Sequence, residues 1–270
     1  MHCFKNAELV SEISIFDRAF HYGDGCFTTS RIRNGCIELE ALHKARLELG
    51  CQKLNLTVNL QLLDETLAVL KHEVSEVSGT LKVVVSRGDG QRGYSLPDHD
   101  ADLWVYFYPK ALEDFNYELI DVGVLQQSIG LCMPNLVGVK SLNRLEQVLL
   151  KNEADKAGWI EGLVTDVQGA IVEGISSNCF ILINDTWITP ELRYNGVHGV
   201  MRTEILKRMQ MQGIPCEKRV VDKDEISHIQ SLFFCNALSP MKIVRKLDNV
   251  CLDTQASIDL FHLLSLNQIR

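Results

Sequence analysis

Apolar residues in this chain recur with two different periods, one typical of helices and one typical of strands, so the pattern predicts a mixed protein. In the N-terminal part a glycine turn leads into an alternating run, and the dipeptide Asn34-Gly35 after it is a strong hairpin signal. Later runs are either β-branched and aromatic or apolar at helical spacing. The expected elements are strands at 27–33, 81–87 and 102–108 and helices at 38–54 and 60–77.

A polar stretch at 109–116 begins with a proline and is typical of a link to a second unit. Beyond it, short strands alternate with a few helices, and no internal repeat is present. The strands are expected at 117–127, 162–166, 170–173, 179–183, 186–189, 215–220, 232–235 and 241–246, and the helices at 143–157, 197–212, 223–227 and 254–266.

The length, amino-acid composition and net charge of the chain limit the kinds of protein that it can be. The chain has 270 residues, of which 46% are hydrophobic and 23% charged, enough for two domains with sizeable cores. Its net charge of -8 argues against nucleic acid or an anionic membrane as the main partner. No apolar run of about 18 residues and no signal-peptide pattern occur. We therefore expect a cytoplasmic protein.

The cysteines and histidines give no sign of a metal site. Nine cysteines are scattered through the chain without a C-x-x-C pair, and the eight histidines include no H-x-x-x-H pair. An odd number of thiols in apolar surroundings is typical of reduced cysteines in a reducing compartment.

Lys140 is the first candidate for chemistry. It follows the apolar, glycine-containing run 136–139 and precedes a predicted helix that Asn143 could cap. A lysine that is partly desolvated there has a lowered pKa, and its free amine suits Schiff-base formation or proton abstraction. The alternative is a surface lysine at a loop–helix junction.

Four further segments could bind anions or place a carboxylate. The glycine-rich loop at 87–94 carries two arginines that could bind a carboxylate, although it could equally be a solvated hairpin loop. The predicted helix start at 199–201 offers free backbone N–H groups to an anion. Glu173 ends a short strand, and Asn236-Ala237 follows an apolar strand.

Taken together, these segments resemble the fold-type IV pyridoxal-phosphate enzymes, a group that holds branched-chain and D-amino acid aminotransferases and 4-amino-4-deoxychorismate lyase. The resemblance covers essentially the whole chain, and within the group three motifs are most similar to the lyase. These motifs are Gly-Asp-Gly-Cys-Phe-Thr-Thr at 23–29, Lys-Ser-Leu-Asn-Arg-Leu-Glu-Gln at 140–147 and Asn-Ala-Leu-Ser-Pro at 236–240.

The resemblance implies a role for each matching residue. Lys140 would be the Schiff-base lysine, and Glu173 would keep the pyridine nitrogen of the cofactor protonated. Arg92 and Tyr94 would contact a substrate carboxylate, and Thr28 would position or protonate the leaving group. The phosphate of pyridoxal 5'-phosphate would be held by Arg46 and by the backbone amides of Val200, Met201, Asn236 and Ala237.

The implied reaction is conversion of 4-amino-4-deoxychorismate to 4-aminobenzoate and pyruvate, a step of folate biosynthesis. An aminotransferase on the same fold is the first alternative. It is less favoured because aminotransferases carry a glutamate or glycine where this chain has Thr28-Thr29. The second alternative is a non-catalytic anion- or metabolite-binding protein.

The resemblance also implies an α+β fold. A small N-terminal domain would occupy residues 1–112, and a larger barrel-like domain at 113–270 would carry Lys140. The cofactor would lie between the domains, and a homodimer partner would close part of the site.

Overall fold

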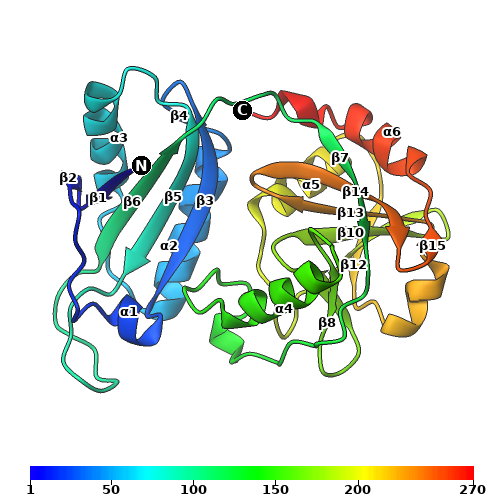
Figure 1. The fold of residues 1–270 in the computed structure, drawn as a ribbon, viewed down its shortest axis with the longest axis horizontal. Helices are drawn as coiled ribbons and strands as arrows, with labels where there is room; N and C mark the ends of the chain where they lie inside the picture. Colours follow the sequence, from blue (N-terminus) through cyan, green and yellow to red (C-terminus); the bar gives the residue numbers. More distant parts are fainter. The chain divides into compact units, whose positions relative to one another are not determined.

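The computed structural model describes residues Met1–Arg270, which divide into two compact units (Figure 1). The first unit comprises Met1–Glu113, Val139–Asn143 and Arg270, and the second comprises Asp114–Gly138 and Arg144–Ile269. Each unit has its own sheet and helices, so the α+β class predicted from the sequence is confirmed.

The first unit is built on a six-stranded antiparallel sheet of order β2-β1-β6-β5-β3-β4. Its predicted hairpin is confirmed, since Asn34 and Gly35 both have left-handed backbones, with φ of 51° and 75°. The elements are β1 His2–Lys5, β2 Glu8–Leu9, α1 Arg18–Tyr22, β3 Gly25–Arg33, β4 Cys36–Ile37, α2 Glu40–Leu54, α3 Gln61–Glu73, β5 Gly79–Ser86 and β6 Asp102–Pro109.

Alternation along β3 gives its side chains two different environments. Cys26 belongs to the hydrophobic core formed with Leu47 and Cys51 of α2, and the Thr28 hydroxyl contacts α2 as well. Phe27 and Thr29 therefore point to the opposite face of the sheet.

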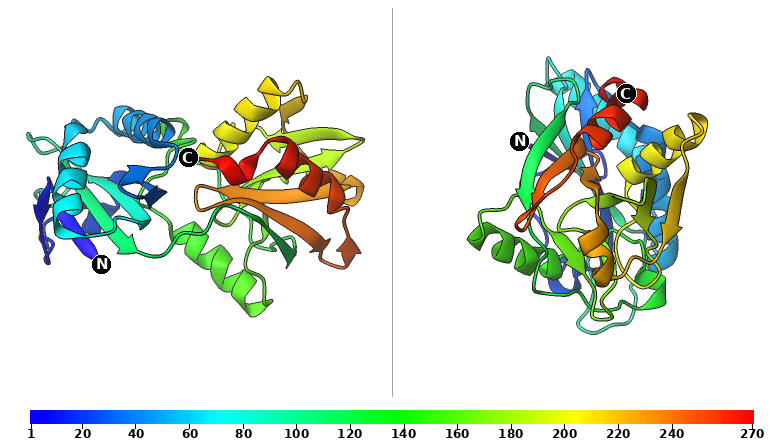
Figure 2. Two further views of the ribbon diagram at one scale, coloured as in Figure 1. Left: turned by 90° about the horizontal axis from the view of Figure 1, so that it is seen from above. Right: turned by 90° about the vertical axis from the view of Figure 1, so that its right-hand side faces the viewer.

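The second unit contains a seven-stranded sheet and a separate β8–β9 pair. Six strands of the sheet follow the order β12-β11-β10-β13-β14-β15, and the seventh, β7, pairs in parallel with β14. Helices α5 and α6 pack against this sheet (Figure 2). The elements are β7 Tyr117–Val122, η1 Pro134–Leu136, α4 Leu145–Lys156, β8 Leu163–Thr165, β9 Ile171–Gly174, β10 Asn178–Ile183, β11 Thr186–Pro190, α5 Val200–Met211, β12 Cys216–Arg219, η2 Lys223–His228, β13 Ser231–Asn236, β14 Ser239–Leu247, β15 Val250–Cys251, α6 Gln255–Leu263 and η3 Leu266–Gln268.

Both faces of this sheet are buried. Phe234 lies in the core cluster on one face, whereas Phe233, its neighbour in the chain, stacks on Phe180 with ring centroids 5.0 Å apart. A strand buried on both sides reads as a continuous apolar run, which explains Leu-Phe-Phe-Cys at 232–235.

Two predicted helices end earlier than their apolar spacing indicates. Helix α3 stops at Glu73 because the β-branched Val74 is extended, with φ of -126° and ψ of 124°. Helix α6 stops at Leu263, and Ser265 adopts a left-handed backbone before the short 3-10 turn η3.

The prediction that Asn143 caps the helix after Lys140 is wrong. The N-cap is Arg144, which makes no side-chain capping bond, and the Asn143 amide nitrogen instead donates to the Gly23 carbonyl oxygen at 3.2 Å. Residues 139–143 run beside β3, and the Leu142 N–H donates to the Gly25 carbonyl at 3.0 Å. This pairing groups Lys140 with the first unit, whereas the family resemblance implied that the second domain carries it.

No helix of the structure is both long enough and apolar enough to cross a membrane. No group of three or more histidine, cysteine or acidic side chains is arranged to hold a metal ion.

Candidate functional site

Lys140 is held by backbone pairing to β3. Its carbonyl oxygen accepts from the Phe27 N–H at 2.9 Å, and the next residue, Ser141, forms a bridge with Cys26. The side-chain Nζ lies 4.8 Å from the centroid of the Phe27 ring. The amine is therefore fixed on the face of β3 that carries Phe27 and Thr29.

Behind that strand, Thr28, His43 and Arg46 form a buried polar cluster. The Thr28 hydroxyl oxygen accepts from Arg46 Nε at 3.1 Å and also from a terminal nitrogen of the same guanidinium. It lies 2.6 Å from His43 Nδ1. Since arginine can only donate, the hydroxyl hydrogen goes to Nδ1, and His43 is a neutral imidazole with its proton on Nε2.

Arg46 has the environment of an anion-binding residue. Burial lowers the pKa of its guanidinium to about 10, and no carboxylate forms an ion pair with it. The Arg46 side chain is half-buried and bonded to Thr28. A half-buried cation with only a neutral partner is best satisfied by an anionic ligand.

The lowered pKa of His43 predicts how the stability of the fold depends on pH. Burial, followed by the charge of Arg46, lowers its pKa from 6.5 to about 3. Between these values the unfolded chain binds a proton that the folded chain does not, so the free energy of unfolding falls as the pH decreases. We expect His43→Gln to remove roughly 1.4 kcal/mol per pH unit of this slope. Urea unfolding of both proteins across this range measures it, and parallel curves would contradict the assignment.

In the second unit, two donors orient the buried carboxylate of Glu173. Its Oε2 accepts from the Asn178 amide nitrogen and from the Val197 N–H, both at 3.0 Å. Gly196 lies against the same oxygen, because a Cβ there would come within 3.4 Å of it, and the φ of 79° also favours glycine. Such a carboxylate can hold a proton on a ligand atom in a defined direction.

Asn178 also lies against the start of α5. A Cβ on Gly199 would come within 1.9 Å of the Asn178 amide oxygen, so glycine is required there. No side chain caps α5, which leaves the first-turn N–H groups, including those of Val200 and Met201, directed at the space before the helix. The helix start predicted from the sequence is confirmed, and it has the donors that a phosphate needs.

Asn236 ends β13, and Ala237 begins the turn to β14. The Asn236 side-chain oxygen accepts from the Leu238 N–H at 3.0 Å and the Ser239 N–H at 2.9 Å, which fixes the shape of the turn. The turn belongs to the same unit as Glu173 and α5.

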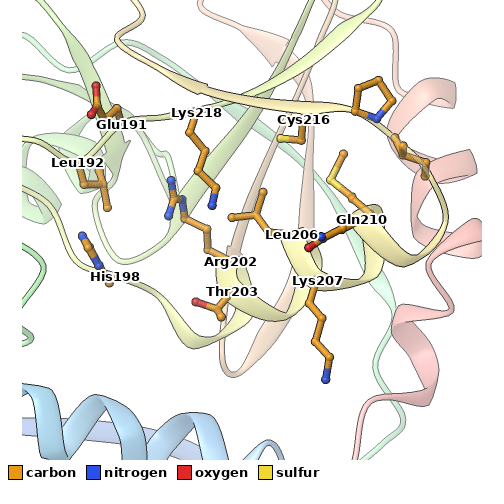
Figure 3. A pocket seen from close by; sticks show the side chains of 13 residues that line it. Glu191, Leu192, His198, Arg202, Thr203, Leu206, Lys207, Gln210, Cys216 and Lys218 are labelled. Atoms are coloured by element: carbon orange, nitrogen blue, oxygen red, sulfur yellow. The ribbon is translucent and has the colours of Figure 1, made fainter.

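A separate cavity of about 830 Å³ lies beside α5 and is lined by Arg202, Lys218 and His198 among others (Figure 3). Arg202 is tied to the end of β11, with Nε 2.9 Å from Thr189 Oγ1 and a terminal nitrogen 3.0 Å from the Pro190 carbonyl. None of the residues predicted to hold the cofactor lines this cavity.

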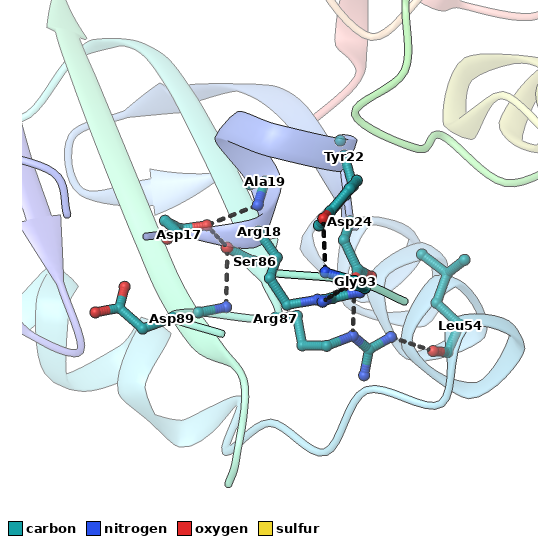
Figure 4. Close-up of polar contacts among 12 residues, drawn as sticks. Asp17, Arg18, Ala19, Tyr22, Asp24, Leu54, Ser86, Arg87, Asp89 and Gly93 are labelled. Carbon is teal, nitrogen blue, oxygen red and sulfur yellow. Dashed lines mark hydrogen bonds and ion pairs between the residues drawn. The ribbon is translucent and has the colours of Figure 1, made fainter. Parts of the chain in front are cut away.

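The loop at 87–94 is anchored by two arginines that share one carboxylate (Figure 4). Asp24 Oδ2 accepts from Arg87 Nε at 2.8 Å and from Arg18 Nε at 2.9 Å. Burial alone would raise the pKa of Asp24, but the hydrogen bonds and charges of these arginines outweigh it and lower the pKa. Arg87 also donates to the Leu54 carbonyl at 2.7 Å, so it serves the fold.

Arg92 and Tyr94 lie on the exposed part of this loop. The Tyr94 side chain is 86% exposed and approaches the ring of Tyr22, with centroids 5.6 Å apart. Arg92 lines a cavity of about 1280 Å³ together with the apolar Phe16 and Phe20. Their contact with a substrate carboxylate stays a prediction.

Sequence reasoning missed His43 and Asn178. His43 and Arg46 are one helical turn apart, so their spacing could have placed both on one face of α2. Asn178 opens β10 and had no comparable signal, because its partners come from β9 and from the segment before α5.

Residues 25–247, which are most of the chain, match the model of a protein family described as "Amino-transferase class IV". The chain belongs to the class IV aminotransferase family. Members of this family depend on pyridoxal phosphate, and the chain is an enzyme of this kind.

Several class IV proteins are similar over nearly their whole length. Aminodeoxychorismate lyase of Vibrio harveyi is 30% identical, with 84% of each chain covered. The crystal structure of 4-amino-4-deoxychorismate lyase from Pseudomonas aeruginosa has a TM-score of 0.85 and 32% identity, covering 96% of this chain and 98% of that one. D-alanine aminotransferase of Staphylococcus aureus is 24% identical, covering 91% and 88%.

Proposed function

We propose that this class IV enzyme is a lyase that converts 4-amino-4-deoxychorismate to 4-aminobenzoate and pyruvate, in folate biosynthesis. The observation that carries the proposal is Lys140, whose backbone is paired to β3 and whose amine lies over Phe27. The two relatives above at 30% identity or more are both such lyases, which supports the choice of reaction.

The residues present fit pyridoxal phosphate by the chemistry of their donors. Arg46 is a half-buried cation without a carboxylate partner, and the start of α5 presents uncapped N–H groups. We propose that these groups and the amides of Asn236 and Ala237 hold the phosphate. Lys140 would bind the cofactor covalently, and Glu173 would hold a proton on the ring nitrogen. When bound, the cofactor supplies an electron sink for a carbon that loses a proton.

Side chains of the protein would carry out the proton transfers of the reaction. The Lys140 amine would take the proton from the amine-bearing ring carbon of the substrate. The ring then becomes aromatic as the bond to the enolpyruvyl oxygen breaks, and the released enol takes up a proton to become pyruvate. Aromatisation provides much of the driving force, so the protein mainly needs to orient the substrate and move protons.

The neighbouring threonines Thr28 and Thr29 should have different roles. Thr28 is 1% exposed and bonded to Arg46, so we now propose that it positions the phosphate arginine. Thr29 pairs with Lys82, whose Nζ lies 4.9 Å from the Phe27 ring centroid, which places Thr29 on the Lys140 face. Thr29 is therefore the better candidate for the hydroxyl that assists the leaving group.

This division can be tested with the matched pair Thr28→Val and Thr29→Val. We expect Thr28→Val to weaken cofactor affinity about tenfold, because Arg46 loses its partner. Thr29→Val should leave affinity unchanged and lower kcat about 100-fold, as expected for a lost proton-transfer group. Equilibrium dialysis with pyridoxal phosphate and steady-state kinetics separate the two effects. The reverse assignment of effects would contradict the proposal.

We further propose a cytoplasmic homodimer. The nine cysteines are free thiols, which a reducing compartment preserves. Around Arg92 the first unit exposes the apolar side chains of Ile15, Phe16 and Phe20 by 61% or more, a surface suited to a second copy of the chain. Sedimentation equilibrium should give twice the chain mass of 30.5 kDa. A monomer at micromolar concentration would refute the dimer.

The experiment that tests the reaction is addition of 4-amino-4-deoxychorismate to the holoenzyme, with pyruvate measured by coupling to lactate dehydrogenase. The lyase releases pyruvate without an amino acceptor. The aminotransferase alternative, supported by the similarity to D-alanine aminotransferase, instead requires a 2-oxo acid and exchanges the amino group. Amino-group exchange without pyruvate from the chorismate would overturn the proposal.

A further inference from the structure

Glu161 is a buried carboxylate to which the proposed mechanism gives no role. Its exposed fraction is 0%, and its hydrogen bonds come from backbone N–H groups and serine hydroxyls. Its charge is balanced by neutral donors alone. Burying a carboxylate costs free energy unless each lone pair accepts a hydrogen bond. A neutral residue would therefore cost less free energy if packing were the only requirement.

All the donors come from Gly162 and from the short loop that follows Glu173. Glu161 Oε1 accepts from the backbone N–H groups of Ile175 at 2.5 Å, Gly162 at 3.3 Å and Ser176 at 3.4 Å. Its Oε2 accepts from the hydroxyls of Ser176 at 3.0 Å and Ser177 at 2.8 Å. One carboxylate thus organises the whole turn.

This turn sets the spacing of the groups around Glu173. The Gly174 N–H donates to the Ser177 carbonyl at 2.6 Å, which closes the turn, and Asn178 comes directly after it. Asn178 then donates to Glu173 across the turn. A Cβ on Gly174 would come within 3.0 Å of the Glu161 carboxyl carbon, so the backbone runs directly over that carboxylate.

The same carboxylate reaches the proposed phosphate turn through one hydroxyl. Because the Ser177 hydroxyl gives its hydrogen to Glu161, its oxygen is left to accept, and the Asn236 amide nitrogen donates to it at 3.1 Å. Asn236 in turn shapes the backbone of Ala237 through its bonds to Leu238 and Ser239. A continuous chain of hydrogen bonds therefore joins Glu161, Ser177 and Asn236.

We propose that Glu161 is a positioning residue that fixes the ring-nitrogen carboxylate Glu173 and the phosphate turn at Asn236 relative to each other. This inference rests on the proposed use of these residues to bind pyridoxal phosphate. It adds that the two contacts are coupled through Ser177 and are lost together.

Two neighbouring serines provide a matched test. Ser176→Ala and Ser177→Ala each remove one hydroxyl from Glu161 Oε2, but only the Ser177 hydroxyl also accepts from the Asn236 amide nitrogen. Ser176 accepts from that nitrogen through its backbone carbonyl, at 3.4 Å, and Ser176→Ala keeps this carbonyl. A purely structural role predicts equal effects. We expect Ser177→Ala to weaken pyridoxal phosphate binding by the apo protein about tenfold, and Ser176→Ala by less than about threefold. Fluorescence titration measures both affinities. Titration with inorganic phosphate should also show weaker binding by Ser177→Ala than by Ser176→Ala.

The variant Glu161→Gln extends the test. Its amide would place N–H groups against the donors of the loop, so binding of both ligands should weaken at least as much as in Ser177→Ala. If Glu161→Gln does not fold, the comparison of Ser176→Ala with Ser177→Ala tests the inference by itself. Equal affinities in the two serine variants, or wild-type affinities in a folded Glu161→Gln, would overturn the inference. Failure of the wild-type protein to bind pyridoxal phosphate would instead overturn the proposed function.

Discussion

Replacing Lys140 with alanine should lower turnover by about 10,000-fold or more, because in the proposed mechanism one amine serves as both the covalent attachment and the proton acceptor. The visible absorbance of cofactor bound covalently to the protein should disappear at the same time. The stability of the fold should change little, since the backbone of Lys140 makes the contacts to β3. Absorbance spectroscopy and the pyruvate assay measure the two losses.

Lys82 offers a matched control for this experiment. Its Nζ lies 4.9 Å from the centroid of the same Phe27 ring, compared with 4.8 Å for Lys140. Both amines therefore have similar ring contacts, but only Lys140 matches the family motif. Lys82→Ala should keep the covalent absorbance. If Lys82→Ala loses it and Lys140→Ala keeps it, the assignment of the catalytic lysine is wrong.

The second large effect is expected at Glu173. Glu173→Gln keeps the size of the side chain but removes the charge that would hold a proton on the cofactor ring nitrogen. We expect kcat to fall about 100-fold, as for loss of a single electrostatic contact in other active sites. Covalent binding of the cofactor should persist, because the proposed attachment is through Lys140. Steady-state kinetics measure the fall in kcat, and the absorbance of the bound cofactor shows whether covalent binding persists.

Glu204 is a suitable control for Glu173. It is another carboxylate of the second unit with little exposure, and it pairs with Arg208 along α5, with no contact to Glu173. Glu204→Gln should reduce stability slightly and leave kcat near the wild-type value. A fall in kcat of similar size in both variants would show that the loss at Glu173 is not specific to the ring nitrogen.

The sequence by itself determined the elements that have strong local signals. The Asn34-Gly35 turn fixed the β3–β4 hairpin, and the paired β-branched runs predicted β5 and β6, because these preferences act between neighbours in the chain. The glycine before Val200 marked the start of α5 in the same way. Recognition of the family motifs added Lys140, Glu173 and Arg46, which no periodicity could have selected.

Only the tertiary structure decided which partners these residues have. Lys140 pairs with β3, 113 positions earlier at Phe27, and this contact turned Asn143 away from capping its helix. Thr28 and Thr29 look equivalent in the sequence but lie on opposite faces of one strand. Glu161 carries no motif signal, and its role follows from hydrogen bonds to a loop 14 to 16 residues away. Such contacts join distant segments, so local preferences cannot specify them.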